Sequence, residues 1–206
     1  MKIIGLTGPS GSGKGTISQA FAQFGIPSVD TDKAYHELLI PPSPCLDDLV
    51  KRFGRNILRS DGSLDRSALA SFVFAPGHED DLHDLNTITH KYVLDVTRNI
   101  CRLLDQKGCP AVLVDAPLLF ESGFDAECDL TIAILADPDL RLLRIMQRDG
   151  LSLSQAQARL SAQKPDDYYI QRATHTIYNN GLPTDMQEQV AALALSWGGS
   201  QTKGHL

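Results

Sequence analysis

The chain begins with a short apolar run that ends in a crowded set of glycines. The run is Lys2–Thr7, and the stretch after it reads GPSGSGK, from Gly8 to Lys14. Glycines this dense weaken a helix and add nothing to a packed core, so bare backbone must be needed here. The stretch fits the pattern G-x-x-x-x-G-K, and it stands between a predicted strand and a helix predicted over residues 15–24. The sequence therefore predicts a strand, a phosphate-binding loop and a helix, in that order.

Three features of this loop favour the binding of a polyphosphate. Glycines let successive backbone N–H groups curl around phosphate oxygens, the helix N-terminus adds a partial positive charge, and Lys14 adds a full one. A glycine-rich turn with an unrelated lysine is the alternative, which the flanking strand and helix disfavour. The residues expected to contact the nucleotide here are Gly8, Gly11, Ser12, Gly13, Lys14, Gly15 and Thr16.

Apolar runs and amphipathic patterns alternate along the rest of the chain, which is typical of an α/β fold with a parallel sheet covered on both faces. Strands are predicted over residues 2–7, 27–29, 111–114 and 130–135. Further helices are predicted over residues 33–39, 139–149, 154–163 and 184–197. The stretch 47–107 holds no convincing strand and is too long for a simple crossover, so it is predicted to be an all-helical insertion.

Proline and glycine mark the two ends of that insertion. Pro41, Pro42 and Pro44 are expected to close the helix before it, because proline cannot continue a helix. Gly108 and Pro110 mark the return to the sheet. The last residues of the chain are rich in Gly, Ser and Lys, and a disordered tail is expected there.

Charge and cysteine content narrow the class of ligand. Lys and Arg number 19 against 25 Asp and Glu, and the net charge of −6 argues against a nucleic-acid partner bound through a basic surface. An anionic substrate must therefore meet a local cluster of positive groups.

The cysteines stand singly, as in a protein with reduced thiols, and no apolar stretch approaches the roughly 20 residues that cross a bilayer. We expect a cytoplasmic protein with no membrane partner, and its oligomeric state is left open, a monomer being compatible with the sequence.

Carboxylates follow two of the predicted strands. Asp30 and Asp32 end the second strand and Asp115 ends the third, so all three are expected at the sheet edge that carries the phosphate loop. Carboxylates in that position accept a proton from an attacking hydroxyl or hold a metal-bound water. Helix capping is the alternative for Asp30 and Asp32, and a turn before Pro117 is the alternative for Asp115.

The residue after the loop lysine departs from the usual pattern. Gly15 stands where a Ser or Thr hydroxyl normally ligates Mg²⁺, and Thr16 follows it. The variant G-K-G-T resembles adenylate kinases, so Gly15 does not exclude kinase activity. The missing hydroxyl shifts metal binding to other groups, and Mg²⁺ is expected to be held through water by Thr16, Asp30 and Asp115.

An arginine row follows a well-marked helix start. Asp137 and Pro138 form a capping residue and a first helical residue. Arg141, Arg144 and Arg148 then fall on one helical face at i, i+3 and i+7. A solvated surface row is one interpretation, and a clamp for a transferring phosphoryl group is the other. The clamp is favoured for Arg144 and Arg148, and less so for Arg141.

Together these motifs resemble the dephospho-CoA kinase family over nearly the whole chain. The matching segments are GLTGPSGSGK at residues 5–14, DTD at 30–32, DGSL at 61–64, LNTITH at 85–90, VDAPLLFESG at 114–123, MQRD at 146–149, AQ at 162–163 and NNG at 179–181. The PLLFE and LNTITH segments are much more specific than the phosphate loop.

The resemblance implies a fold and a domain arrangement. It implies a P-loop kinase core at about residues 1–40, 108–140 and 170–198, a helical CoA domain at about 41–107, a helical lid at about 141–169, and a tail at 199–206. It also implies an activity, the transfer of the γ-phosphate of ATP to the ribose 3′-hydroxyl of dephospho-CoA, with ATP and Mg²⁺ required.

The resemblance further implies roles for single residues. It makes Asp32 the candidate general base, in contact with dephospho-CoA. It also implies that Lys14 and the loop amides bind the β- and γ-phosphates. Arg144 and Arg148 become catalytic lid residues. Asn180 becomes a contact of ATP near its adenine, with an ordinary Asn-Gly turn as the alternative.

Some positions depart from the family pattern. Besides Gly15, these include His36, where an arginine is common, and Lys91, where proline usually follows the histidine. They bear on substrate affinity more than on reaction type. His36 and His90 are candidate contacts of the acidic CoA moiety, with a structural role as the alternative for each.

Two rival functions stay open. Gly15 and Thr16 suggest a kinase for another small acceptor such as a nucleoside monophosphate, but the D-G-[FY]-P-R segment that resembles the monophosphate site of adenylate kinases is absent. The second rival is a nucleotide-binding protein that has lost turnover, for which the missing hydroxyl at residue 15 is the supporting feature.

Overall fold

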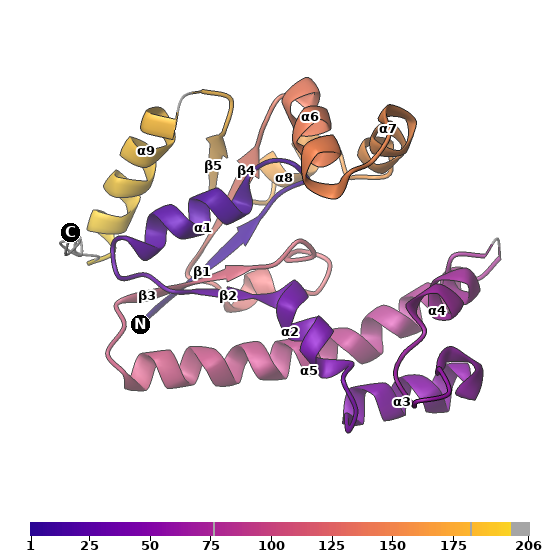
Figure 1. The fold of residues 1–206 in the computed structure, drawn as a ribbon. Helices are drawn as coiled ribbons and strands as arrows, with labels where there is room; N and C mark the ends of the chain where they lie inside the picture. The colour runs from indigo at the N-terminus through magenta and orange to yellow at the C-terminus, as the bar shows by residue number, and fades with distance from the viewer. Residues whose placement is uncertain (76, 182, 199–206) are drawn as a thin grey trace. The chain divides into compact units, whose positions relative to one another are not determined.

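The computed structural model describes residues 1–75, 77–181 and 183–198 (Figure 1). Contacts divide the chain into two compact units, Met1–Asp30 with Cys101–Leu206, and Thr31–Ile100. We refer to the first as the sheet unit and to the second as the helical unit. The tail expected at 199–206 lies outside the described residues. In the part of the chain that is described, no helix is long and apolar enough to cross a membrane.

The sheet unit is built on a parallel sheet with strand order β2-β3-β1-β4-β5. Its strands are β1 (Lys2–Thr7), β2 (Ser28–Asp30), β3 (Ala111–Asp115), β4 (Leu130–Leu135) and β5 (His175–Tyr178). The strand β1 is central, with Ile4 opposite Leu113 on one side and Leu130 on the other. The side chains of Ile4 and Leu6 are fully buried, which explains the continuous apolar run of this strand.

The four strands predicted from the sequence are present, with ends that differ by at most one residue, but β5 was not predicted. Only Ile177 of its four residues is buried. The segment therefore lacks the apolar run that marks the central strands. The signal that it does carry is the enrichment of Thr176, Ile177 and Tyr178 in β-branched and aromatic side chains.

One cluster of the core joins the sheet to α1 (Lys14–Ala22) and α9 (Pro183–Ser196). The apolar stripe of α1, which includes Ile17 and Phe21, packs with Val190 and Ala194 of α9. The Phe21 ring stacks on that of Trp197, with centroids 5.5 Å apart. This packing fixes α1 on the sheet, so its N-terminus lies directly after the loop that follows β1.

The remaining helices of the sheet unit follow β3 and β4. They are η2 (Phe124–Glu127), α6 (Pro138–Asp149), α7 (Leu153–Ser161) and α8 (Asp166–Ile170). The short α8 was not predicted, because five residues show no helical periodicity. Its Tyr169 packs with Ala133 and Leu135 of β4.

The helical unit contains α2 (Thr31–Leu38), α3 (Pro44–Phe53), η1 (Arg55–Ile57), α4 (Arg66–Val73) and most of α5 (Glu79–Gln106). Its own core includes Leu46, Leu49 and Leu69. Among the described residues of this unit, the one β pairing is an isolated bridge between Leu58 and Leu64, in line with the all-helical expectation for 47–107.

One expectation for the start of the helical unit was wrong. Pro44 does not close the preceding helix but occupies the first position of α3, which begins before residue 47. The Ser43 hydroxyl caps this helix by accepting a hydrogen bond from the backbone N–H of Leu46 at 3.1 Å. Proline suits that position, because the first helical N–H has no partner inside the helix.

Candidate active site

The loop between β1 and α1 lies at the carboxyl end of the central strand, where ligands bind in open α/β sheets. Gly11 and Gly13 adopt positive φ angles of 81° and 93°, and Gly13 caps α1 without any side-chain hydrogen bond. Within the described part of the chain, the backbone N–H groups of Gly11, Gly13 and Gly15 donate no hydrogen bond. Unused donors at a helix N-terminus form a binding site for an anion.

Neighbouring atoms of the protein leave little room for a side chain at three of the loop glycines. A Cβ atom at Gly8 would lie 2.2 Å from the carbonyl oxygen of Ile134. One at Gly11 would lie 2.7 Å from the carbonyl oxygen of Arg141, and one at Gly13 would lie 2.2 Å from Nδ2 of Asn179. The loop is therefore packed closely against β4, α6 and the segment after β5.

Lys14 and Ser12 are two of the polar side chains of the loop. The Lys14 ammonium donates to the carbonyl oxygen of Gly8 at 3.0 Å, which holds a full positive charge across the loop. The Ser12 side chain is fully buried, and its Oγ makes no hydrogen bond within the described residues. Gly15 and Thr16 are exposed in the first turn of α1, and a Cβ at Gly15 would meet no atom within 4 Å.

Two of the predicted metal-binding carboxylates lie side by side. Asp30 and Asp115 are register partners in β2 and β3, and Asp115 is also the register partner of Leu6 in β1. Carboxylate oxygens suit Mg²⁺, which takes few protein ligands and keeps several waters. Among the described residues, no group of three or more His, Cys, Asp or Glu is placed to hold a metal ion. The pair thus fits a cation that is also bound by phosphate oxygens and water.

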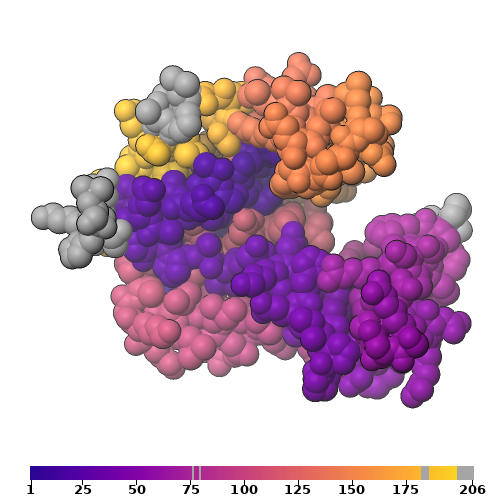
Figure 2. Space-filling model, viewed as in Figure 1, coloured from indigo at the N-terminus to yellow at the C-terminus, as the bar shows by residue number. Residues whose placement is uncertain are grey.

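The three arginines of α6 all reach the phosphate loop. Arg141 Nε donates to the carbonyl oxygen of Ser10 at 3.2 Å, and Arg144 Nη1 donates to that of Gly11 at 3.2 Å. Arg148 Nη2 donates to the Ser10 hydroxyl at 3.2 Å. In the space-filling view, the orange atoms of α6 and α7 lie directly beside the indigo atoms of the N-terminal segment (Figure 2). The interpretation as a solvated row therefore does not fit Arg141 and Arg144, whereas Arg148 reaches the loop from an exposed position.

The environments of these arginines differ. Arg141 is only 5% exposed, and burial lowers the pKa of its guanidinium, an effect that nearby Asp166 opposes. Arg148 is exposed and forms two hydrogen bonds with Asp149, at 2.7 and 2.9 Å. The same pairing raises the pKa of Arg148 and lowers that of Asp149. Arg159 also donates to Asp149, at 2.7 Å. The Arg148 guanidinium thus bonds both the Ser10 hydroxyl of the loop and the Asp149 carboxylate.

The NNG segment holds the loop in place. Asn179 Nδ2 donates to the carbonyl oxygen of Ser12 at 2.8 Å, and the Asn179 carbonyl oxygen accepts from Arg144 at 3.0 Å. Sequence reasoning missed Asn179, and its place beside Asn180 in the NNG motif was the available signal.

Asn180 forms a reciprocal pair with Asp137. Its Nδ2 donates to the Asp137 carboxylate, and its Oδ1 accepts from the Asp137 backbone N–H, both at 2.7 Å. Asp137 and Pro138 occupy the cap and the first position of α6, as expected, but the Asp137 carboxylate bonds Asn180 and no helix amide. The expected contact of Asn180 with adenine stays a prediction.

Three predicted site residues belong to the helical unit. Asp32 and His36 are exposed on one face of α2 at i and i+4, with Asp32 in the first helical turn. The His36 ring lies 5.7 Å from that of Tyr35, and His90 is half-buried in α5. Along the chain, only Thr31 separates Asp32 from the last residue of β2.

Comparison with known proteins adds an independent finding. The sequence profile of the dephospho-CoA kinase family matches residues 2–185. A dephospho-CoA kinase of Symbiobacterium thermophilum is 39% identical over 196 residues, which cover 93% of this chain and 80% of that protein. Among solved structures, a Thermus thermophilus protein is similar with a TM-score of 0.77 and 31% identity, covering 95% of this chain and 97% of the other. A dephospho-CoA kinase from Campylobacter jejuni has a TM-score of 0.68 and 28% identity, covering 94% and 96%.

Proposed function

The chain belongs to the dephospho-CoA kinase family, and we propose how its residues divide the work of that family's reaction. The enzyme transfers the γ-phosphate of ATP to the ribose 3′-hydroxyl of dephospho-CoA, which gives CoA and ADP in the last step of CoA biosynthesis. The observation that carries the assignment to this site is the set of unused loop amides beside the Lys14 ammonium.

The loop binds the triphosphate. The N–H groups of Gly11, Gly13 and Gly15 donate to the β- and γ-phosphate oxygens, and Lys14 neutralises their charge. Arg144 and Arg148 stabilise the negative charge of the phosphoryl group during transfer, and their position on the loop supports this role. In-line positioning of the two nucleotides then supplies much of the rate.

Asp32 acts as the general base. As the 3′-oxygen forms its bond to the γ-phosphorus, the bond from phosphorus to the β,γ-bridging oxygen breaks, ADP leaves, and Asp32 takes the hydroxyl proton. Its exposed carboxylate in the first turn of α2, just after the carboxyl end of β2, supports this role. His36 lies on the same helical face and, with His90, contacts the CoA moiety.

Asp30, Asp115 and the Thr16 hydroxyl would hold Mg²⁺ through water at the sheet edge, an assignment that the adjacent carboxylates support. When bound, Mg²⁺ supplies positive charge to the β- and γ-phosphate oxygens. From the sequence we also propose that the protein is cytoplasmic. The sequence leaves its oligomeric state open, and light scattering after size-exclusion chromatography measures the mass of the particle in solution.

An acceptor assay tests the function. The protein is incubated with Mg-ATP and either dephospho-CoA, AMP or no acceptor, and ADP release is measured. ADP release that depends on dephospho-CoA is expected. AMP-dependent release would indicate a nucleoside monophosphate kinase, and no release with any acceptor would indicate a nucleotide-binding protein without turnover.

Two substitutions separate nucleotide binding from catalysis. Lys14→Ala should lower kcat/KM by about 10³-fold or more, because it removes the full charge on the β- and γ-phosphates. Asp32→Asn should lower kcat by about 10²- to 10⁴-fold while the Kd for ATP changes little. Calorimetry measures the Kd, and the acceptor assay measures kcat. An Asp32→Asn variant that loses ATP binding as severely as turnover would reassign Asp32 to structure or to the metal.

A further inference from the structure

Ser10 of the phosphate loop is held at all three of its polar groups by one segment of the sheet unit. Its backbone N–H donates to Oε1 of Gln163 at 2.9 Å. Its carbonyl oxygen accepts from Arg141 and its hydroxyl accepts from Arg148, each at 3.2 Å. Arg141 and Arg148 lie in α6 and Gln163 follows α7, so all three partners are far from Ser10 along the chain.

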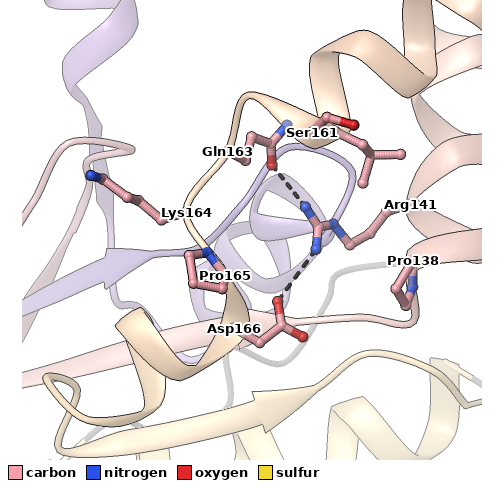
Figure 3. A pocket seen from close by; sticks show the side chains of 8 residues that line it. Pro138, Arg141, Ser161, Gln163, Lys164, Pro165 and Asp166 are labelled. Atoms are coloured by element: carbon pink, nitrogen blue, oxygen red, sulfur yellow. Dashed lines mark hydrogen bonds and ion pairs between the residues drawn. The ribbon is translucent and has the colours of Figure 1, made fainter.

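Gln163 is the junction of this network. Its Oε1 accepts a second hydrogen bond, from Arg141 Nη2 at 2.8 Å, and its Nε2 donates to the carbonyl oxygen of Arg159 at 3.2 Å. Arg141 Nη1 also reaches Asp166, at 3.3 Å. Figure 3 shows the Arg141 guanidinium between Gln163 and Asp166, with the Lys164 ammonium directed away from it. Arg141, Gln163 and Asp166 are among the residues that line a pocket of about 420 Å³ on α6 and the α7–α8 segment.

Through these hydrogen bonds Gln163 restrains the backbone conformation of the loop. Gly11 and Gly13 hold φ values that few other residues adopt, and glycine backbone has many alternatives of similar energy. The bond from Gln163 fixes the peptide plane before Ser10, next to the amides that face the triphosphate. Loss of its acceptor would leave the Ser10 N–H and one N–H of the buried Arg141 unsatisfied.

We propose that Gln163 is a positioning residue that holds the Ser10–Gly13 backbone in the conformation that binds the nucleotide phosphates. This inference rests on the proposed function of the loop. Gln163 acts through Ser10 and Arg141 and sets nucleotide affinity more than the stability of the fold. In the sequence, Gln163 stands out only as part of the AQ segment. No pattern of neighbouring residues connects it to a loop 153 residues away.

Matched variants test the role. Gln163→Leu removes the acceptor at nearly constant volume, Gln163→Asn keeps the amide but is one carbon too short to reach Ser10, and Gln163→Glu keeps an acceptor oxygen. Gln157→Leu is the control, because Gln157 is exposed on α7 and its side chain makes no hydrogen bond within the described part of the chain. ADP affinity is measured by calorimetry without acceptor, together with steady-state kinetics, the unfolding temperature, and amide exchange of residues 8–13.

We expect Gln163→Leu and Gln163→Asn to raise the Kd for ADP and the KM for ATP about 5- to 10-fold, with faster amide exchange in the loop. The KM for dephospho-CoA and the kcat should stay within about threefold of wild type, and Gln157→Leu within about twofold in all parameters. Gln163→Glu should recover part of the ADP affinity that Gln163→Leu loses, because it keeps the acceptor for Ser10 and Arg141 but replaces the Nε2 donor to the Arg159 carbonyl oxygen.

Unchanged ADP affinity in both the Leu and Asn variants would overturn the proposal, as would a Glu variant as weak as Leu. A loss of unfolding temperature without a loss of ADP affinity would assign Gln163 to structure alone. The proposed function fails separately, if the wild-type protein binds ADP but shows no turnover that depends on dephospho-CoA.

Discussion

At the residue scale, Gly15 differs from the other glycines of the phosphate loop. Gly8, Gly11 and Gly13 each have a backbone or side-chain atom where a Cβ would stand, whereas Gly15 has open space. It is exposed in the first turn of α1, and its φ is not in the positive region. No packing constraint therefore requires glycine here, and its consequence is chemical: the chain lacks the hydroxyl that usually ligates Mg²⁺.

Gly15→Ser should consequently lower the Mg²⁺ concentration that gives half-maximal activity, by about threefold to tenfold, because the hydroxyl adds one oxygen ligand. Activity is titrated with Mg²⁺ at fixed ATP. Gly15→Ala is the control, because it adds the same Cβ without the oxygen. Identical titrations for the two variants would show that the hydroxyl has no effect on the metal.

At the element scale, the site depends on how α1 is held. Its N-terminus presents the loop amides, and its other residues anchor it through Phe21, which is fully buried and stacks on Trp197 beyond the end of α9. The helix has no acidic residue in its first turn and no side-chain cap, so its local signals for starting at residue 14 are weak. Packing of its apolar stripe therefore stabilises it more than its sequence propensity does.

Phe21→Ala should lower the free energy of unfolding by about 3–5 kcal/mol, because it removes a buried ring and leaves a cavity beside Trp197. Phe74→Ala is the control for the same chemical change at a side chain that is 68% exposed, and it should cost less than about 0.5 kcal/mol. Denaturation by guanidinium chloride measures both. A loss in the free energy of unfolding that is as small for Phe21→Ala as for Phe74→Ala would mean that the packing of Phe21 contributes little to stability.

At the scale of the whole molecule, the buried thiol of Cys45 and the partly buried thiol of Cys128 make stability sensitive to alkaline pH. Burial raises the pKa of Cys128 to about 12, with a further increase from nearby Asp125, and raises that of Cys45 to about 11. The ordinary value is 9.0, so above pH 9 the unfolded chain loses these protons while the folded protein keeps them. The unfolded state then binds fewer protons than the folded state, and the free energy of unfolding falls as pH rises from 9 toward these raised values.

Cys128→Ala should make the decrease in stability between pH 8 and pH 10 smaller than in wild type. One thiol contributes at most about 1.4 kcal/mol per pH unit within this window. Urea denaturation at several pH values measures the slope, and only slopes are compared, because the substitution also removes packing beside Gly5. Cys109→Ala controls for the loss of any cysteine. Equal slopes for wild type and Cys128→Ala would contradict the assignment.

Much of the fold was predictable from short stretches of sequence. The central strands, the phosphate loop and the arginine face of α6 follow from patterns within about ten residues, and each is present. The strand β5 and the helix α8 were not predictable, since they span only His175–Tyr178 and Asp166–Ile170 and neither shows a clear period. Their places depend on contacts with β4, as Ile177 opposite Ile134 and Tyr169 against Leu135 illustrate.

The sequence alone determined that a glycine-rich loop would join a buried strand to a helix, and that arginines would share one helical face, because both depend on the geometry of neighbouring residues. Only the tertiary structure decided which atoms those groups meet. The bond from Ser10 to Gln163 and the bond from Asn179 to Ser12 join residues 153 and 167 positions apart. Such bonds form only when the packing of the whole sheet unit brings both partners within about 3 Å, and no local pattern encodes that distance.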